Sequence, residues 1–413
     1  MKKWHEWILF FILAFTACAV TLYKFNIEPR GLAVDEVEFA KAVEYLSRVP
    51  YQPFTPLADG HPTVYFYILL LSFKIFGITS FALRLPSALF GIGSVFVAYF
   101  IFRKTFSKSY LVYIPLVFWI TFIFATLRWR FLFTRYSFEM PYLLFLELMG
   151  IWCVLKAGEL KFAPTIYFVL IGLFSGLAYN SYQPGRIFFL VPLVYLLINK
   201  VTWKKIALYL GIFVLTILPM TVYLFQHPAD DIRIGQQSYL MDKRVSLDKK
   251  VTNFTSNIVS TILMFSVKGD LNGRHNYPGK AALNPILSVL FIGGLILALL
   301  RIKDRNVMLF LVYFVVALVP TLLTSPGENP HMLRTYTVIP SVVFFIGLCI
   351  DIVIRSKFAS RFTWFAFVII VCCLLSAVYD IRTYFYYEPS VNNHAFPMNG
   401  PLTGILKSEK SLQ

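Results

Sequence analysis

Long apolar blocks alternate along this chain with short polar segments, and the alternation predicts a helical membrane protein. A helix needs roughly 20 mostly apolar residues to cross a hydrocarbon layer of about 30 Å. Eleven blocks are interpreted as spans, which makes the expected fold all-α and polytopic. They cover residues 7–25, 81–102, 110–127, 136–155, 164–180, 185–199, 205–225, 284–300, 307–323, 335–354 and 362–380.

The polar segments between the spans predict their orientation. Cytoplasmic loops carry an excess of Lys and Arg, and six short segments here hold at least two basic residues each. These are Lys2-Lys3 and residues 103–109, 156–161, 199–205, 301–306 and 355–361. Placing them inside puts the N-terminus in the cytoplasm and the C-terminus outside.

Two apolar segments are predicted to lie along the outer interface instead of crossing the membrane. Residues 63–77 number only 15 and include Lys74, and counting them as a span would invert every later loop. A helix lying in the interface suits both the length and the charge. Residues 251–267 are interpreted in the same way.

The outer side then receives two large loops, residues 26–80 and 226–283. Neither loop is long enough for a separate soluble domain, and no internal repeat is visible. The expected organisation is one transmembrane domain, residues 1–380, followed by a short outer tail, residues 381–413.

The composition is that of a membrane protein, and this affects the interpretation of the net positive charge. The 413 residues are 58% hydrophobic and 14% charged, whereas soluble domains are about 45–50% apolar and about 25% charged. The net charge of +17 would suggest nucleic acid in a soluble protein, but most basic residues flank spans, so no nucleic-acid partner is expected. The five cysteines lie in apolar runs without metal-ligand spacing.

Polar side chains gather in the outer loops and at the outer ends of the spans. A charge near the bilayer is costly unless it has a partner or a task, and Arg is well shaped for bidentate contact with a phosphate. An anionic lipid headgroup would give these arginines a role. The group comprises Asp35, Glu36, His61, Arg84, Arg128, Arg130, Arg135, Tyr182, Gln183, Arg186, Arg274, His275, His331 and Arg334.

The adjacent acids Asp35 and Glu36 are the best candidates for chemistry. The apolar spacing of VDEVEFAKAVEYLSR, residues 34–48, predicts a helix with both acids in its first turn. Carboxylates in the first turn of a helix interact favourably with the helix dipole, so both acids could serve the structure alone. A carboxylate within about 2.6–3.2 Å of a hydroxyl proton can also act as a general base, and spacing alone leaves both interpretations open.

The other outer groups also have structural alternatives. His61 could cap the interfacial helix, and Arg84 could extend to lipid headgroups. Arg186 and Arg334 end short turns rich in Pro and Gly, and contact with lipid headgroups is the structural alternative for both.

The same holds for three arginines in the segment before residue 136. Arg128, Arg130 and Arg135 are expected to contact lipid phosphates or to pair with Glu139.

Several motifs together resemble the polyprenyl-phosphate-dependent glycosyltransferases of the GT-C fold. The chain is most similar to glycosyltransferase family 39, the protein O-mannosyltransferase group in its bacterial form, and is related to the aminoarabinose transferases of family 83. The matching stretches are VDEVEFAKA at 34–42, GHPTVYFYILLLSFKIFG at 60–77, FALRLPSALFGIGSVFVAYFIFRK at 81–104, GLFSGLAYNSYQPGR at 172–186, GDLNGRHNYPG at 269–279 and NPHMLRTYTVIP at 329–340.

The resemblance implies a reaction and a location. A sugar, on the family average a mannose-like hexose or pentose, would move with inversion from a polyprenyl phosphate to a hydroxyl. The acceptor would be a glycan, a lipid or a protein, and the site would face outward from the plasma or inner membrane. Family similarity makes Asp35 the general base and gives Glu36 a supporting or acceptor-orienting role.

Further site residues follow from the same resemblance and from the outer polar groups. His61 and Arg84 match positions near the donor phosphate, and Arg186 and Arg334 are added there by inference. Tyr182, Gln183, Arg274, His275 and His331 are assigned to substrate binding, with Arg274 and His275 on a loop over the acceptor.

The chain also departs from these relatives. Eukaryotic protein O-mannosyltransferases carry a large lumenal domain and aminoarabinose transferases a C-terminal periplasmic one, so neither acceptor carries over. No DxD motif occurs in the outer loops, so no metal is predicted, although a divalent ion stays possible. The alternative functions are a transporter or flippase of lipid-linked sugars, or a polymerase of them; the visible repeats that transporters commonly show are missing here.

Overall fold

The computed structural model describes residues 3–106, 108–159, 164–230, 238–356 and 364–410. The predicted inner segments 156–161 and 355–361 fall partly outside the described residues. So do Lys2, the first two residues of the span predicted at 362–380, and part of the loop at 226–283.

Each of the eleven predicted spans corresponds to a helix, which confirms the all-α polytopic fold. The helices are α1 (Lys3–Leu22), α4 (Ser80–Phe106), α5 (Leu116–Thr126), α7 (Met140–Glu159), α8 (Thr165–Tyr179), α9 (Leu190–Ile198), α10 (Trp203–Gln226), α13 (Pro285–Leu300), α14 (Arg305–Leu322), α15 (Ile339–Arg355) and α17 (Trp364–Arg382). Among the described residues, seven helices are long and apolar enough to cross a membrane. The shorter ones include α5, α8 and α13.

Several helices begin later than the spans predicted from the sequence, and α5 and α7 show why. Residues 110–115 form a hairpin of β3 (Tyr110–Leu111) and β4 (Ile114–Pro115), and α5 starts only at Leu116. The backbone of Ile114, which precedes a proline, is disfavoured in the helical region. Likewise α7 starts at Met140, because Pro141 is suited to the first helical turn, where its missing N–H is not needed.

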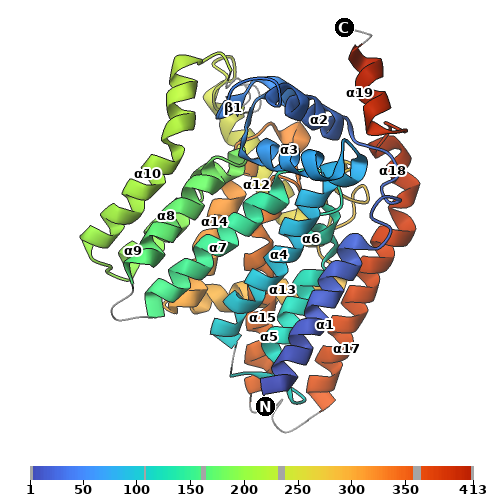
Figure 1. Cartoon of the computed structure of the whole chain (residues 1–413). Helices are drawn as coiled ribbons and strands as arrows, with labels where there is room; N and C mark the ends of the chain where they lie inside the picture. Colours follow the sequence, from blue (N-terminus) through green and yellow to red (C-terminus); the bar gives the residue numbers. More distant parts are fainter. Residues whose placement is uncertain (1–2, 107, 160–163, 231–237, 357–363, 411–413) are drawn as a thin grey trace.

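The helices pack in a bundle whose interior is formed by α4, α5, α7 and α15 (Figure 1). Next to them, α8 packs on α7, and α10 packs on α8 at one side of the bundle. Small residues permit the closest approaches: a Cβ at Gly294 of α13 would lie 1.8 Å from the carbonyl oxygen of Phe345 in α15. Such contacts are typical of helix pairs in membranes.

The first predicted outer loop folds into a cap over one end of the bundle, opposite the end that holds the N-terminus (Figure 1). It consists of α2 (Val34–Leu46), β1 (Phe54–Thr55), the 3-10 turn η1 (Leu57–Asp59), β2 (His61–Pro62) and α3 (Val64–Phe76). The antiparallel strands pair Phe54 with Pro62 and Thr55 with His61. The helices predicted at residues 34–48 and 63–77 are thus confirmed as α2 and α3.

The rest of this capped end comes from distant parts of the chain. The helix predicted at 251–267 is α12 (Leu247–Ser266), which starts earlier because the Ser246 side chain accepts a hydrogen bond from the Lys249 N–H. Shorter elements complete this end and the turns between the long helices. They are α6 (Arg128–Leu132), η2 (Gln183–Ile187), η3 (Pro326–Glu328), η4 (Tyr336–Val338), the π-helix η5 (Thr383–Tyr387), α18 (Pro389–Ala395) and α19 (Leu402–Lys410).

The described part of the predicted tail at 381–413, residues 381–410, packs back onto the cap. Leu32 and Met398 exchange backbone hydrogen bonds of 2.8 and 3.1 Å just before α2 begins. Gly31 makes this approach possible, since a Cβ there would lie 2.0 Å from the Phe396 carbonyl oxygen. The tail therefore forms part of the surroundings of α2.

Candidate active site at the capped end

Glu36 is fully buried at the start of α2 and makes four hydrogen bonds. Its carboxylate accepts two of 2.9 Å from the guanidinium of Arg84, one of 2.8 Å from the Ser137 N–H and one of 3.0 Å from the Ala33 N–H. Arg84 also donates to the carbonyl oxygens of Pro29 and Gly31. The pair fastens α2 to α4 and to the segment before α7.

This geometry separates the roles of residues that the sequence grouped together. Neither Glu36 nor Arg84 lines any of the cavities described below. Arg84 is 1% exposed and its donors face Glu36 and backbone carbonyls. We therefore treat Glu36 and Arg84 as positioning residues. That Arg84 binds the donor phosphate, and that Glu36 orients the acceptor or supports Asp35, stay predictions.

Asp35, the neighbour of Glu36, points the other way. Its side chain is 41% exposed and forms an ion pair with Arg274, from the loop between α12 and α13. Asp35 lines three cavities, with volumes of about 430, 470 and 60 Å³. One residue of α2 thus stands where three hollow regions meet.

The 470 Å³ cavity is the polar one and collects most of the predicted substrate-binding residues. Asp35, Tyr182, Arg274, His275, His331 and Arg334 all line it. They come from α2, the turn before η2, the α12–α13 loop and the segment between η3 and η4. Segments separated by up to 299 positions therefore meet in one place, as Arg334 and Asp35 illustrate.

An apolar cavity of about 280 Å³ lies beside the polar one. Tyr182 and Arg334 line both. Its apolar wall includes Leu240, Val319 and Leu323, and its polar groups include Gln183 and Arg186. Among the described residues, the buried amide nitrogen of Gln183 has no hydrogen-bond partner, which is costly unless a ligand or water supplies one.

His61 sits behind Asp35 in the smallest cavity. It is 2% exposed, and its Nδ1 lies 2.7 Å from a carboxylate oxygen of Glu139. Its ring also stacks at 6.3 Å on that of Tyr182. The structure thus places His61 between the polar cavity's wall and a buried acid.

Glu139 therefore pairs with His61, and the prediction that Arg128, Arg130 or Arg135 pairs with it is wrong. Those three arginines are buried and have other partners. Arg130 and Arg135 donate mainly to backbone carbonyls. The reason is long-range: Arg130 reaches a carbonyl oxygen in α4, and Arg135 reaches carbonyl oxygens near the end of α1.

Arg128 has a structural role that reaches the cavity. It donates to Glu388 at 2.8 Å and to Asn276 at 2.6 Å, and Asn276 in turn donates at 2.9 Å to the Asp270 carbonyl oxygen. Burial raises the pKa of Glu388, and the Arg128 charge opposes that rise. This network holds the α12–α13 loop, and with it Arg274, against the C-terminal elements.

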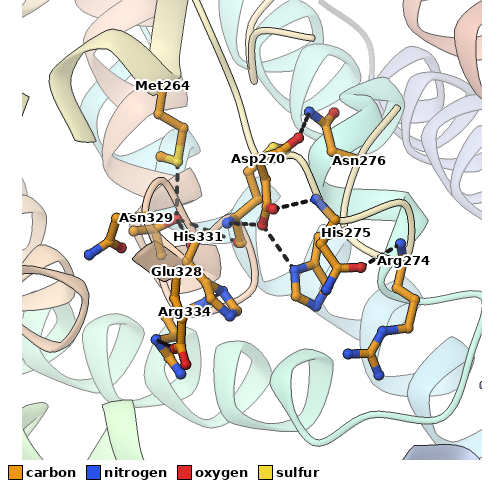
Figure 2. Close-up of polar contacts among 12 residues, drawn as sticks. Met264, Asp270, Arg274, His275, Asn276, Glu328, Asn329, His331 and Arg334 are labelled. Carbon is orange, nitrogen blue, oxygen red and sulfur yellow. Dashed lines mark hydrogen bonds and ion pairs between the residues drawn. The ribbon is translucent and has the colours of Figure 1, made fainter. Parts of the chain in front are cut away.

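Asp270, which the sequence analysis missed, organises the far wall of the polar cavity (Figure 2). One carboxylate oxygen lies 2.9 Å from Nδ1 of His275 and accepts a 2.9 Å hydrogen bond from the Met332 N–H. The rings of His275 and His331 are 4.7 Å apart. Burial, and then the neighbouring His275, lowers the pKa of His331 well below its usual value.

Comparisons with known proteins agree with the fold. Residues 60–225, less than half of the chain, match the family model described as dolichyl-phosphate-mannose-protein mannosyltransferase. A search of curated proteins gives no match.

Two solved structures illustrate the fold similarity. ArnT from Cupriavidus metallidurans, bound to undecaprenyl phosphate, aligns with a TM-score of 0.63 and 13% identity over 96% of this chain and 78% of its own. The oligosaccharyltransferase AglB from Archaeoglobus fulgidus, in complex with an inhibitory peptide and a dolichol-phosphate, aligns with a TM-score of 0.57 and 14% identity. The alignment covers 97% of this chain and 56% of AglB. This chain therefore spans just over half of that second protein.

The fold shared with ArnT and AglB confirms the predicted GT-C fold. Residues 60–225 are in addition similar to the mannosyltransferase family model.

Proposed function

We propose that this chain transfers a sugar from a polyprenyl-phosphate donor to an acceptor hydroxyl, and that Asp35 is the general base. One observation carries the proposal. The carboxylate of Asp35 lies in a polar cavity that shares Tyr182 and Arg334 with an apolar, arginine-bearing cavity. A lipid-linked sugar needs such a pair of adjoining regions.

The donor would occupy both cavities. Its prenyl chain would lie against Leu240, Val319 and Leu323, and its phosphate between Arg186 and Arg334. Guanidinium groups bind phosphate oxygens well. They would also stabilise the charge that grows on the leaving phosphate, a large term in transfer reactions.

The acceptor would enter from the other side of Asp35. The 430 Å³ cavity there is lined by Asn272, Arg274, His394 and Pro397 among others. A hydroxyl reaching Asp35 from this cavity would attack the anomeric carbon from the side away from the phosphate, which gives inversion. Arg274 would release the Asp35 carboxylate as the acceptor hydroxyl takes its place.

The substrate classes follow the resemblance. A mannose-like hexose or pentose is proposed as the sugar, and a glycan, a lipid or a protein as the acceptor. The orientation follows the basic segments, which place the capped end and Asp35 on the extracytoplasmic side of a plasma or inner membrane, with the N-terminus in the cytoplasm.

Replacement of the base tests this proposal. Asp35→Asn should lower turnover about 10²–10⁴-fold, the usual contribution of a general base, while polyprenyl-phosphate-mannose still binds. Glu38→Gln is the matched control, because Glu38 lies on the same helix and lines the smallest cavity with Asp35. It should keep most of the activity.

Product formation is measured by mass spectrometry on the purified full chain offered several lipid-linked sugars. Full turnover by Asp35→Asn would contradict the assigned base. The chain would instead be a transporter or flippase if it moves the lipid-linked sugar across a vesicle membrane and transfers no sugar. Asp35→Asn should then move the lipid-linked sugar as fast as the wild type.

A further inference from the structure

We propose that Asp270, His275 and His331 bind one divalent transition-metal ion of the zinc class, with an open coordination position toward the polar cavity. The three side chains offer ligand atoms that all lie within 4.8 Å of one another. Two imidazoles and a carboxylate are a donor set that zinc favours.

The short Asp270–His275 contact fits two ligands of a single ion. Ligand atoms held at about 2.0–2.1 Å from a tetrahedral zinc ion lie about 3.3–3.4 Å apart. The carboxylate oxygen and Nδ1 are 2.9 Å apart here, so a small separation of the two groups would admit the ion. His331 belongs to a different segment and completes the set, because its ring lies beside that of His275 (Figure 2).

The surroundings of Asp270 resemble the outer shell that orients metal ligands in proteins. Backbone N–H groups of Asn272 and Met332 donate to its two carboxylate oxygens at 2.8 and 2.9 Å. Nδ1 of His331 accepts a long hydrogen bond, 3.3 Å, from the Arg334 N–H.

Two nearby cations would oppose a metal ion if they were unpaired. Figure 2 shows the two imidazole rings between the side chains of Arg274 and Arg334. Each guanidinium has a carboxylate partner, Asp35 for Arg274 and Glu328, at 2.6 Å, for Arg334. The local charge is therefore balanced, and the Asp270 carboxylate remains to meet the ion.

Three protein ligands leave at least one position open, the arrangement typical of catalytic and not structural zinc. All three ligands line the 470 Å³ cavity, so a ligand in that cavity can reach the ion. Given the proposed function, the group that fits the open position is a phosphate oxygen of the donor. This second part depends on the proposed function, whereas the metal site itself does not.

The test measures metal content without donor or acceptor. The full chain in lipid nanodiscs is stripped with chelator and equilibrated with Zn²⁺ alone, and bound zinc is counted by elemental mass spectrometry. We expect about one ion per chain, and an affinity at least tenfold weaker in His331→Phe and in Asp270→Asn. His227→Phe is the matched control, because exposed His227 lines none of the cavities described, and it should bind as the wild type does.

Cobalt supplies a second readout. Co²⁺ in place of Zn²⁺ should give visible absorption that His331→Phe abolishes and that inorganic phosphate changes. Thermal unfolding in chelator confirms that each variant is folded, and His275→Gln replaces any variant that is not. Zinc binding no stronger in the wild type than in His275→Gln would overturn the site. Cobalt spectra that phosphate leaves unchanged would overturn the open position alone.

Discussion

Two neighbouring acids on one helix form two very different ion pairs. Glu36 and Arg84 are almost fully buried, and Arg84 donates two hydrogen bonds of 2.9 Å to Glu36. Asp35 and Arg274 keep 41% and 27% of their side-chain surfaces exposed and face the cavities. Under the proposed function, the buried pair would hold the site in place, and the exposed pair would take part in the chemistry.

Burial explains the difference. A buried ion pair has lost its hydration and depends on its partners, so removing one partner costs far more than the pair contributes. A half-exposed pair is screened by water and is worth about 0–1 kcal/mol. Such a pair can open at little cost, and the proposed general-base role of Asp35 requires that freedom.

The largest expected effect on folding comes from breaking the buried pair. Arg84→Ala leaves Glu36 without its charge partner and should lower the free energy of unfolding by about 3–5 kcal/mol. Thermal unfolding of the purified chain measures this loss. Arg103→Ala is the matched control on the same helix, because its pair with Glu6 is 48% and 42% exposed. Equal losses in the two variants would contradict the contrast between buried and exposed pairs.

A substitution at the boundary between the apolar and polar cavities should lower the affinity for the donor. Arg334→Gln removes a guanidinium from the proposed phosphate site and should weaken polyprenyl-phosphate binding about tenfold, since hydrogen bonds to charged groups contribute about 1.5–3 kcal/mol. Binding is measured by equilibrium titration in nanodiscs. Arg244→Gln, at a side chain 91% exposed, provides the control. Unchanged affinity in Arg334→Gln would move the phosphate elsewhere.

The smallest effect on folding is expected for the half-exposed pair. Arg274→Gln should change the free energy of unfolding by no more than about 1 kcal/mol, while altering the acceptor concentration at half-maximal rate. Steady-state kinetics and thermal unfolding together check this split. A loss of stability as large as that of Arg84→Ala would show that Arg274 is a structural residue like its buried counterpart.

The sequence predicted the helices of the bundle and the helix that begins at Val34, because apolar periodicity is a local property. It could not separate Asp35 from Glu36, since both lie in the first turn. What separates them is long-range: Arg84 and Ser137 reach Glu36 from 48 and 101 positions away. The same limit explains Asp270, whose partners His275 and Met332 lie on two segments that only the fold brings together.

A structure of the full chain with a non-transferable polyprenyl-phosphate sugar is the decisive test of the proposed donor site. We expect the prenyl chain in the apolar cavity and phosphate oxygens within about 2.7–3.2 Å of the Arg186 or Arg334 guanidinium. The anomeric carbon should face Asp35 with the phosphate on its far side. A sugar bound with its phosphate between Asp35 and the anomeric carbon, or in a cavity that Asp35 does not line, would contradict the account.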